Sequence, residues 1–280
     1  MTCISRAISS LEKRTNYRCD DNIAVLLLPR PLQVLIRIPF FRTLFIRLFA
    51  PKGMYEYVIA RTKFIDAIFA QALANQFLQI VLLGAGFDTR GLRFQGETAS
   101  TRIFELDAPI TQSAKMGQYL KRGLNLPGNV QFMPIDLDQE SLPAKLAEIG
   151  FRRAERTLFI LEGLLMYLQP ESVDRIFQIV RESTEKGSEI VFDYVYSSVL
   201  RHENLYVGER EILRTVSKAG EQWHFGIEKG EINQFLERYG MRLVEHMDAE
   251  RLEGMYFKDT VGRIVGRING THAIARATRV

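Results

Sequence analysis

The sequence contains little cysteine, with only Cys3 and Cys19 among its 280 residues. Two cysteines do not make a disulfide framework, which small secreted domains need when their core is small. Residues 1–22 are polar and charged, so they also lack the apolar core of a signal peptide. We therefore expect a cytoplasmic protein without structural disulfides.

The sequence also lacks a strong charge bias. It has 37 Lys and Arg against 33 Asp and Glu, a net charge of +4, and no block of five like charges. This balance gives no indication of nucleic-acid binding. Apolar residues make up 46% of the chain, enough for a large core. The length fits one α/β domain with an added element, or two small domains.

No apolar run long enough to span a membrane is free of charge. The most apolar stretch, residues 32–50, carries Arg37, Arg42 and Arg47, with Pro39 in its middle. Each arginine would cost roughly 2.5–3.5 kcal/mol at the centre of a bilayer, so a membrane-spanning helix is not expected. A pair of short helices packed on the domain is the favoured interpretation. A basic amphipathic segment lying on a membrane surface is the weaker alternative.

A short apolar run followed by glycines lies between residues 80 and 90. Ile80 to Leu83 fit a strand that is buried on both faces of a parallel sheet. Gly84 and Gly86 then permit a sharp turn and the close approach of a ligand, and a helix start follows. These parts form the floor of many nucleotide sites. The third glycine of the dinucleotide fingerprint is missing, so a plain tight turn is the alternative.

The rest of the chain alternates between predicted strands and helices. Residues 1–30 and 32–50 are typical of helices, and residues 54–75 of one long amphipathic helix. We expect strands at 79–84, 102–107, 130–135, 157–163, 188–195, 241–248 and 270–279. We expect further helices at 89–94, 109–123, 141–149, 171–186 and 229–240. This order predicts a mostly parallel sheet with helices on both faces. Because residues 249–269 look like a loop, the last two strands should pair antiparallel.

Residues 196–228 interrupt this alternation. The stretch is polar at first, then helical, and ends in Trp223-His224-Phe225-Gly226. It lies between the fifth strand and the next helix. An insertion there should cover the carboxyl edge of the sheet, where substrates bind in open α/β folds.

Acidic residues follow the second and third strands. Asp107 comes about 20 residues after Gly86, a spacing that places a carboxylate on ribose hydroxyls. Glu105 competes for that role, and helix capping is the alternative for Asp107. Asp136 could accept a hydrogen bond from an adenine amino group, with Leu137 against the base. A surface turn explains that pair equally well.

Two further charged residues lie in mainly apolar surroundings. Glu162 precedes Gly163 inside an apolar run, where a carboxylate is costly without a partner. It either faces a central cleft or forms a salt bridge within the protein. Arg61 lies on the long predicted helix, and its guanidinium fork suits a carboxylate. Taken alone, a helical arginine is usually just solvated.

Five segments occur in one order with consistent gaps: Arg61-Thr-Lys-Phe-Ile-Asp66, Leu83-Gly-Ala-Gly-Phe-Asp-Thr-Arg90, Phe104-Glu-Leu-Asp-Ala-Pro109, Asp136-Leu137 and Glu162-Gly-Leu-Leu-Met-Tyr-Leu168. Together they resemble the leucine carboxyl methyltransferase family, over roughly residues 55–245. That family includes protein phosphatase methyltransferases and bacterial O-methyltransferases linked to polyketides. The resemblance implies a Rossmann-like seven-stranded methyltransferase sheet, mostly parallel with an antiparallel last strand, plus an N-terminal helical cap.

The resemblance also implies S-adenosyl-L-methionine as the methyl donor. It assigns cofactor contacts to Arg61, Gly84, Gly86, Asp107, Asp136, Leu137 and Glu162. Arg61 would clamp the methionine carboxylate, and Glu162 would lie near the methionine amino group. Asp107 would hold the ribose, and Asp136 with Leu137 the adenine.

The N-terminal region is the part that the resemblance constrains least. We expect residues 1–53 to form the helical cap and residues 54–280 the methyltransferase domain, with 196–228 as a substrate lid. The phosphatase enzymes of the family also use an N-terminal lysine for the cofactor. The nearby basic candidates here are Lys13, Arg14 and Arg18.

The expected activity is O-methylation of a carboxyl or hydroxyl group of a small molecule, with polyketides among the candidates. A carboxylate acceptor, pKa about 4, is ionised at pH 7 and needs no base, whereas a phenol, pKa about 10, would be helped by one. His202 and His224 are the candidate bases, although a structural histidine is the alternative. Tyr194 and Tyr196 could orient the acceptor.

Two other functions stay open. A non-catalytic or membrane-associated protein of the same fold is suggested by the basic apolar segment at 32–50. A protein C-terminal carboxyl methyltransferase acting on a phosphatase tail is the other. Neither a metal ion nor a nucleic-acid partner is expected.

Overall fold

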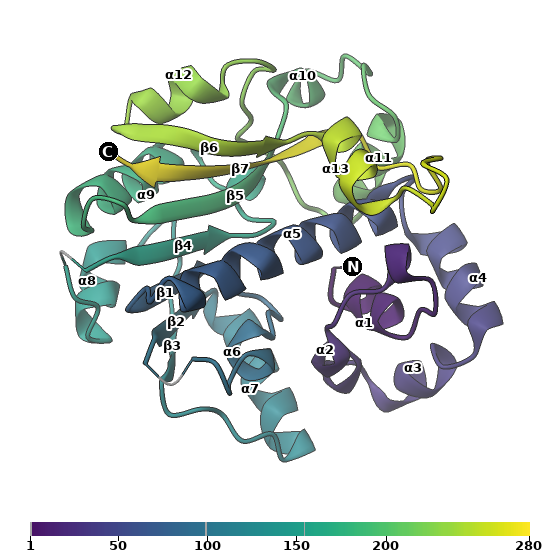
Figure 1. Cartoon of the computed structure of the whole chain (residues 1–280), viewed down its shortest axis with the longest axis horizontal. Coiled ribbons are helices and arrows are strands. Elements are labelled where there is room, and N and C mark those ends of the chain that lie inside the picture. Colours follow the sequence, from purple (N-terminus) through teal and green to yellow (C-terminus); the bar gives the residue numbers. More distant parts are fainter. Residues whose placement is uncertain (1, 99, 154) are drawn as a thin grey trace.

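The computed structural model describes residues 2–98, 100–153 and 155–280, so that Met1, the first residue of the predicted cap, lies outside it. These residues form a seven-stranded sheet with the order β3-β2-β1-β4-β5-β7-β6 (Figure 1). The strands are β1 (Gln79–Leu83), β2 (Arg102–Asp107), β3 (Val130–Pro134), β4 (Thr157–Leu161), β5 (Glu189–Val195), β6 (Met241–Met247) and β7 (His272–Arg279).

The strand directions confirm the predicted fold class. β1 pairs parallel with β2 and with β4, and the parallel pairing continues to β3 on one side and β5 on the other. β7 runs antiparallel between β5 and β6. Every residue of β1 is buried, as expected for a central parallel strand covered on both faces.

Helices lie on both faces of the sheet, and a further group of helices comes from the N-terminal segment of the chain (Figure 1). The first group contains α1 (Thr2–Ser10), α2 (Asn22–Leu27), α3 (Arg30–Leu35) and α4 (Pro39–Phe49). The others are α5 (Met54–Ala74), α6 (Arg90–Arg93), α7 (Pro109–Arg122), α8 (Leu142–Glu148), α9 (Pro170–Ser183), α10 (Ser197–Leu200), α11 (Glu209–Lys218), α12 (Ile232–Glu237) and α13 (Ala249–Tyr256). Short 3-10 turns are found at Thr15–Tyr17 and Leu165–Tyr167.

The expectation of a plain loop over 249–269 was wrong, because α13 forms its first eight residues. The side chain of Asp248 caps this helix by accepting a hydrogen bond from the Arg251 amide at 2.9 Å. Leu252 and the following Phe257 are fully buried. The helix has only about two turns and contains Gly254, a poor helix former, so its apolar pattern is too short to recognise.

Alternate residues of the strands supply two separate cores. Ile80, Leu82 and Val191 belong to the core beneath α5, which crosses one face of the sheet (Figure 1). Val81, Leu83 and Phe192 belong to the core beneath α8, α9 and α12 on the other face. Successive side chains of a strand point to opposite faces of the sheet. The place of a charged residue along its strand therefore decides which of the two cores it faces.

The segment 30–49 forms two helices as predicted, and the partly buried Leu32, Phe45 and Ile46 pack them against the core. Figure 1 shows α3 and α4 at the outer edge of the molecule, with α1 between them and the long helix α5. α3 has no buried residue, and Arg42 is the only buried residue of α4. Within the described residues, no helix combines the length and apolar character needed to cross a membrane.

Candidate functional site

The glycine turn after β1 depends on two left-handed residues. Gly84 has φ +64° and Gly86 has φ +50°. A Cβ at Gly84 would come within 2.8 Å of Leu164 Cδ1, so the chain needs glycine to pass beneath that side chain. A Cβ at Gly86 would meet nothing closer than 3.8 Å. The turn is therefore tight at Gly84 and opens onto free space at Gly86.

A cavity of about 160 Å³ adjoins this turn. Its walls come from the turn itself, from the ends of β1 and β4, and from α1 and α5. The lining residues are Thr2, Arg6, Arg61, Leu82, Leu83, Gly84, Ala85, Gly86, Phe87, Asp88, Ile160, Glu162 and Gly163. Four of the seven predicted cofactor residues therefore line one cavity, namely Arg61, Gly84, Gly86 and Glu162.

Arg61 reaches the cavity from α5 and is held by two carboxylates. Its Nε donates to Glu162 at 3.1 Å and its Nη1 donates to Asp193 at 2.5 Å. Asp193 also accepts hydrogen bonds from the Tyr57 hydroxyl at 3.0 Å and the Gly163 amide at 2.5 Å. The Nη2 group of Arg61 makes no hydrogen bond within the described residues. The fork is thus fixed in place with donor capacity left over.

Glu162 lies between two arginines, since Arg90 also donates to it at 2.8 Å. Arg90 in turn binds Asp66 at 2.7 Å and also Asp88. Burial alone would raise the pKa of Glu162, but the guanidinium groups of Arg90 and Arg61 outweigh it and hold that pKa well below its usual range. Glu162 therefore stays ionised at pH 7. Its ion pairs with Arg61 and Arg90 bear out the salt-bridge interpretation, and its position in the cavity bears out the cleft interpretation.

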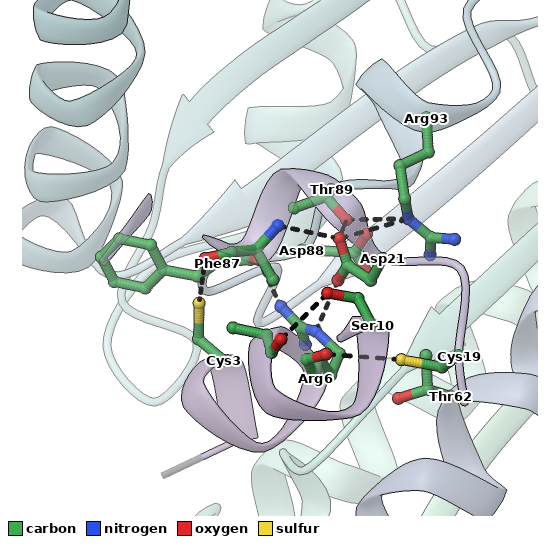
Figure 2. Close-up of polar contacts among 12 residues, drawn as sticks. Cys3, Arg6, Ser10, Cys19, Asp21, Thr62, Phe87, Asp88, Thr89 and Arg93 are labelled. Carbon is green, nitrogen blue, oxygen red and sulfur yellow. Dashed lines mark hydrogen bonds and ion pairs between the residues drawn. The ribbon is translucent and has the colours of Figure 1, made fainter. Parts of the chain in front are cut away.

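Arg6 of α1 is a cavity residue that the sequence analysis missed. Its Nε donates to Asp21 at 2.8 Å and its Nη2 donates to the Phe87 carbonyl at 2.5 Å, which fastens α1 to the glycine turn (Figure 2). The predicted N-terminal cations Lys13, Arg14 and Arg18 are exposed and do not line the cavity. Arg6 occurs in a nine-residue helix in which residues 4–10 are all buried, so no polar face distinguished it.

Asp107 and Glu105 were competing candidates, and the structure separates them. Asp107, at the end of β2, accepts a hydrogen bond from the Gly86 amide at 2.9 Å. Burial raises the pKa of Asp107, against the opposing effect of its backbone hydrogen bonds. Glu105 is fully enclosed and paired with Lys115, and a Cβ at Gly91 would come within 3.0 Å of its Oε1. Only Asp107 therefore contacts the turn.

Asp136 and Leu137 lie apart from this cavity. The Asp136 carboxylate is exposed and accepts from the amide of Asp138 at 3.0 Å, as in a surface turn. Leu137 lines a different hollow, about 500 Å³, between α8 and α9. Their contact with adenine remains a prediction.

The candidate acceptor residues are also not gathered at the cavity. His202 and His224 are exposed, and the His224 amide donates to the Met166 carbonyl at 2.7 Å. Tyr194 points to the opposite face of β5 from Asp193, where its hydroxyl lies 3.0 Å from His246 Nε2. Tyr196 is buried and stacks on Tyr206 at 5.0 Å. Their roles with an acceptor remain predictions.

His272 is a second residue that the sequence analysis missed. It begins β7, and its ring centroid lies 4.7 Å from that of Tyr57 and 5.5 Å from that of Trp223. Nδ1 lies 2.7 Å from Thr271 Oγ1. Burial lowers the pKa of His272 to about 4, so the ring is neutral at pH 7. Its place beside Tyr57 depends on β7 lying next to β5, which local sequence does not reveal.

The sequence profile of the leucine carboxyl methyltransferase family matches residues 1–181. The chain belongs to the leucine carboxyl methyltransferase family. This membership confirms the resemblance drawn from the five motifs, and the match extends further toward the N-terminus than the motifs did.

Two relatives of this chain have names that state S-adenosyl-L-methionine as the methyl donor. It is 26% identical over 201 residues to a Bacillus subtilis strain 168 protein named "Putative S-adenosyl-L-methionine-dependent methyltransferase YktD", covering 72% of this chain and 66% of that one. It is 33% identical over 159 residues to a similarly named Mycolicibacterium smegmatis protein, covering 56% and 52%. The matches thus span about half to two thirds of these relatives.

One solved structure resembles the chain along nearly its whole length. It is a protein from Thermobifida fusca YX described as a "putative methyltransferase", with a TM-score of 0.57 and 16% identity. The likeness covers 99% of this chain and 94% of that one. At this identity it supports the fold, which is the Rossmann-like methyltransferase fold predicted from the sequence.

Proposed function

We propose that the chain is an S-adenosyl-L-methionine-dependent O-methyltransferase that methylates a carboxyl or hydroxyl group of a small molecule, with polyketides among the candidate acceptors. The observation that carries this proposal is the cavity at the glycine turn, where Arg6 and Arg61 lie beside Gly84 and Gly86. The family membership and the donor named in its relatives support it.

The residues of the cavity fit the methionine end of the donor. A carboxylate needs hydrogen-bond donors with positive charge, and Arg61 retains its Nη2 group for that purpose. A volume of about 160 Å³ is below the roughly 300–1,000 Å³ of a whole ligand pocket, so the cavity matches one end of the donor only. Asp107 is proposed for the ribose, and Asp136 with Leu137 for the adenine.

When bound, the donor supplies a methyl group on a positively charged sulfur. The residues of this chain bind and orient it: Glu162 and Asp193 hold the Arg61 guanidinium, and Arg6 fastens α1 to the glycine turn. A carboxylate acceptor would be ionised on its own, and alignment would then supply most of the catalysis.

The organisation of the chain is part of the proposal. Residues 1–53 serve as a cap over the donor, residues 54–280 as the methyltransferase domain, and 196–228 as the lid that selects the acceptor. Arg6 on the cavity wall supports the first of these roles, and the position of α10 and α11 after β5 supports the last. The two unpaired cysteines support a cytoplasmic location.

Isothermal titration with S-adenosyl-L-methionine, and separately with S-adenosylhomocysteine, tests the donor. We expect saturable binding of both to the wild type, and the same affinity for Arg210→Ala, a matched exposed arginine on α11. Absence of heat with a folded wild type would overturn the proposal. Radiolabelled methyl transfer to panels of aromatic carboxylic acids, phenols and carboxyl-terminal peptides then separates the acceptor classes.

A further inference from the structure

The pair α3–α4 turns its apolar side chains outward. Eight large apolar residues between 26 and 49 are exposed: Leu26, Val34, Leu35, Ile38, Phe40, Leu44, Leu48 and Phe49. Phe40 is 68% exposed and Leu48 is 65% exposed. Such a cluster is unusual on a water-facing surface and marks a site of contact.

α4 is apolar on two sides. Phe45 and Ile46 are partly buried against the core. Phe40, Leu44 and Leu48 are four residues apart, so they share one face, and that face is exposed. Arg42 is the one buried residue of α4. Its Nη1 donates to the Leu11 carbonyl at 3.0 Å, while its buried Nε has no partner within the described residues. The rest of the chain therefore packs against the side of α4 that carries Phe45 and Ile46, and no described residue covers the Phe40–Leu44–Leu48 face.

The charge of the segment identifies the partner. Residues 22–55 contain no Asp or Glu and five basic residues, Arg30, Arg37, Arg42, Arg47 and Lys52. All but Arg42 are exposed. Two copies of this face would oppose like charges, which disfavours self-association. The surface of an anionic bilayer offers both an apolar layer for the phenylalanines and leucines and negative charge for the arginines.

We propose that α3–α4 docks the protein on an anionic membrane surface. α4 has 11 residues and is about 16 Å long, roughly half the thickness of a bilayer core, so it lies in the interface without crossing it. Phe40, Leu44 and Leu48 enter the boundary between headgroups and acyl chains. Arg37 and Arg47 contact the lipid phosphates. The proposal does not rest on the proposed methyl transfer, because it involves none of the cavity residues.

Vesicle sedimentation with the full chain tests this surface. We expect binding to equimolar phosphatidylcholine and phosphatidylglycerol vesicles, and much weaker binding to phosphatidylcholine alone. Phe40→Ser with Leu48→Ser should weaken binding at least about tenfold, because two apolar anchors are lost. Arg37→Gln with Arg47→Gln should weaken it about twenty-five-fold, at roughly fivefold for each cation near the surface.

A matched control is available on α7, where Leu120 is exposed and is followed by the exposed Lys121. Leu120→Ser with Lys121→Gln should bind vesicles like the wild type, and circular dichroism should show all three variants folded. Two outcomes would overturn the proposal. In the first, the wild type fails to sediment with the anionic vesicles, and a dimer that Phe40→Ser with Leu48→Ser dissociates would then identify a second copy as the partner. In the second, the α3–α4 variants bind as well as the control.

Discussion

Arg61 of the glycine-turn cavity and the two histidines of 196–228 are held in opposite ways. At the cavity, Arg61 is buried between Glu162 and Asp193, each within 3.1 Å. In 196–228, His202 and His224 are exposed, and no described side chain holds either ring by a hydrogen bond. The Arg61 side chain is therefore fixed before any ligand arrives, whereas these two histidine rings are not.

This difference also affects how much a substitution in each region changes the free energy of folding. A buried ion pair contributes little net stability, because removing both charges from water offsets their attraction. Breaking such a pair is expensive, because the remaining charge stays buried without a partner. Arg61 is thus difficult to replace, whereas an exposed histidine of 196–228 can change with little effect on folding.

The largest expected effect is that of Arg61→Ala. It leaves Glu162 and Asp193 buried without their cation, which should lower the free energy of unfolding by about 3–5 kcal/mol. It should also weaken binding of the methyl donor by at least about tenfold. Urea unfolding measures the first effect and titration calorimetry the second. Arg214→Ala, an exposed arginine of α11, should change stability by less than about 0.5 kcal/mol. Equal losses in both variants would remove the contrast between the regions.

The pH dependence of stability gives the next largest effect, through His272. Its pKa is about 4 in the folded protein and about 6.5 when unfolded, so the unfolded chain binds more protons between these values. Stability should therefore fall as the pH drops through this window, by on the order of 2 kcal/mol between pH 7 and pH 5.

Urea unfolding at those two pH values measures this loss. His272→Asn should lose most of the pH dependence, while His224→Asn should keep it because that histidine is exposed. An unchanged pH dependence in His272→Asn would show that the decisive group lies elsewhere.

A smaller effect is expected for Asp107→Ala. Its carboxylate meets the Gly86 amide at the rim of the turn, so its loss should weaken donor binding about tenfold, or about 1.4 kcal/mol. Stability should change less than in Arg61→Ala, since Asp107 has no buried charge partner among the described residues. Asp20→Ala, at an exposed carboxylate on the N-terminal side, is the calorimetric control. Wild-type affinity in the folded Asp107→Ala protein would reject the ribose assignment.

The smallest effects should come from His202→Ala and His224→Ala. Both residues are exposed, so each change should alter stability by less than about 0.5 kcal/mol. With a carboxylate acceptor, turnover should stay within about twofold, because no base is needed. A large loss of turnover in either variant at unchanged donor affinity would instead identify a base, and the two regions would then share the catalytic work.

The sheet was well predicted from sequence because each strand is marked by its own residues. All seven predicted strands exist and end within two residues of their predicted bounds. Asp193 was overlooked even though it interrupts the apolar run of β5, the same signal that singled out Glu162 in its apolar run. Sequence reasoning could have found it.

Other site residues could not be predicted, because distant contacts determine their roles. Arg6 meets Phe87, 81 positions later in the chain. His272 of β7 meets Tyr57 of α5 because the order of the strands in the sheet is not sequential. The outward side of α4 has the same cause. An amphipathic pattern predicts a helix and its two faces, whereas only the arrangement of the neighbouring helices decides which face is covered.

The strand order also has a consequence for biosynthesis. β6 is made before β7, yet β7 is its only neighbour in the described sheet, and β7 also covers the edge of β5. A nascent chain that has reached residue 271 therefore exposes an unpaired β5 edge, the kind of edge that recruits other chains. Completion of the sheet waits for residues 272–279, so a ribosome that stalls shortly before them leaves a product prone to aggregation.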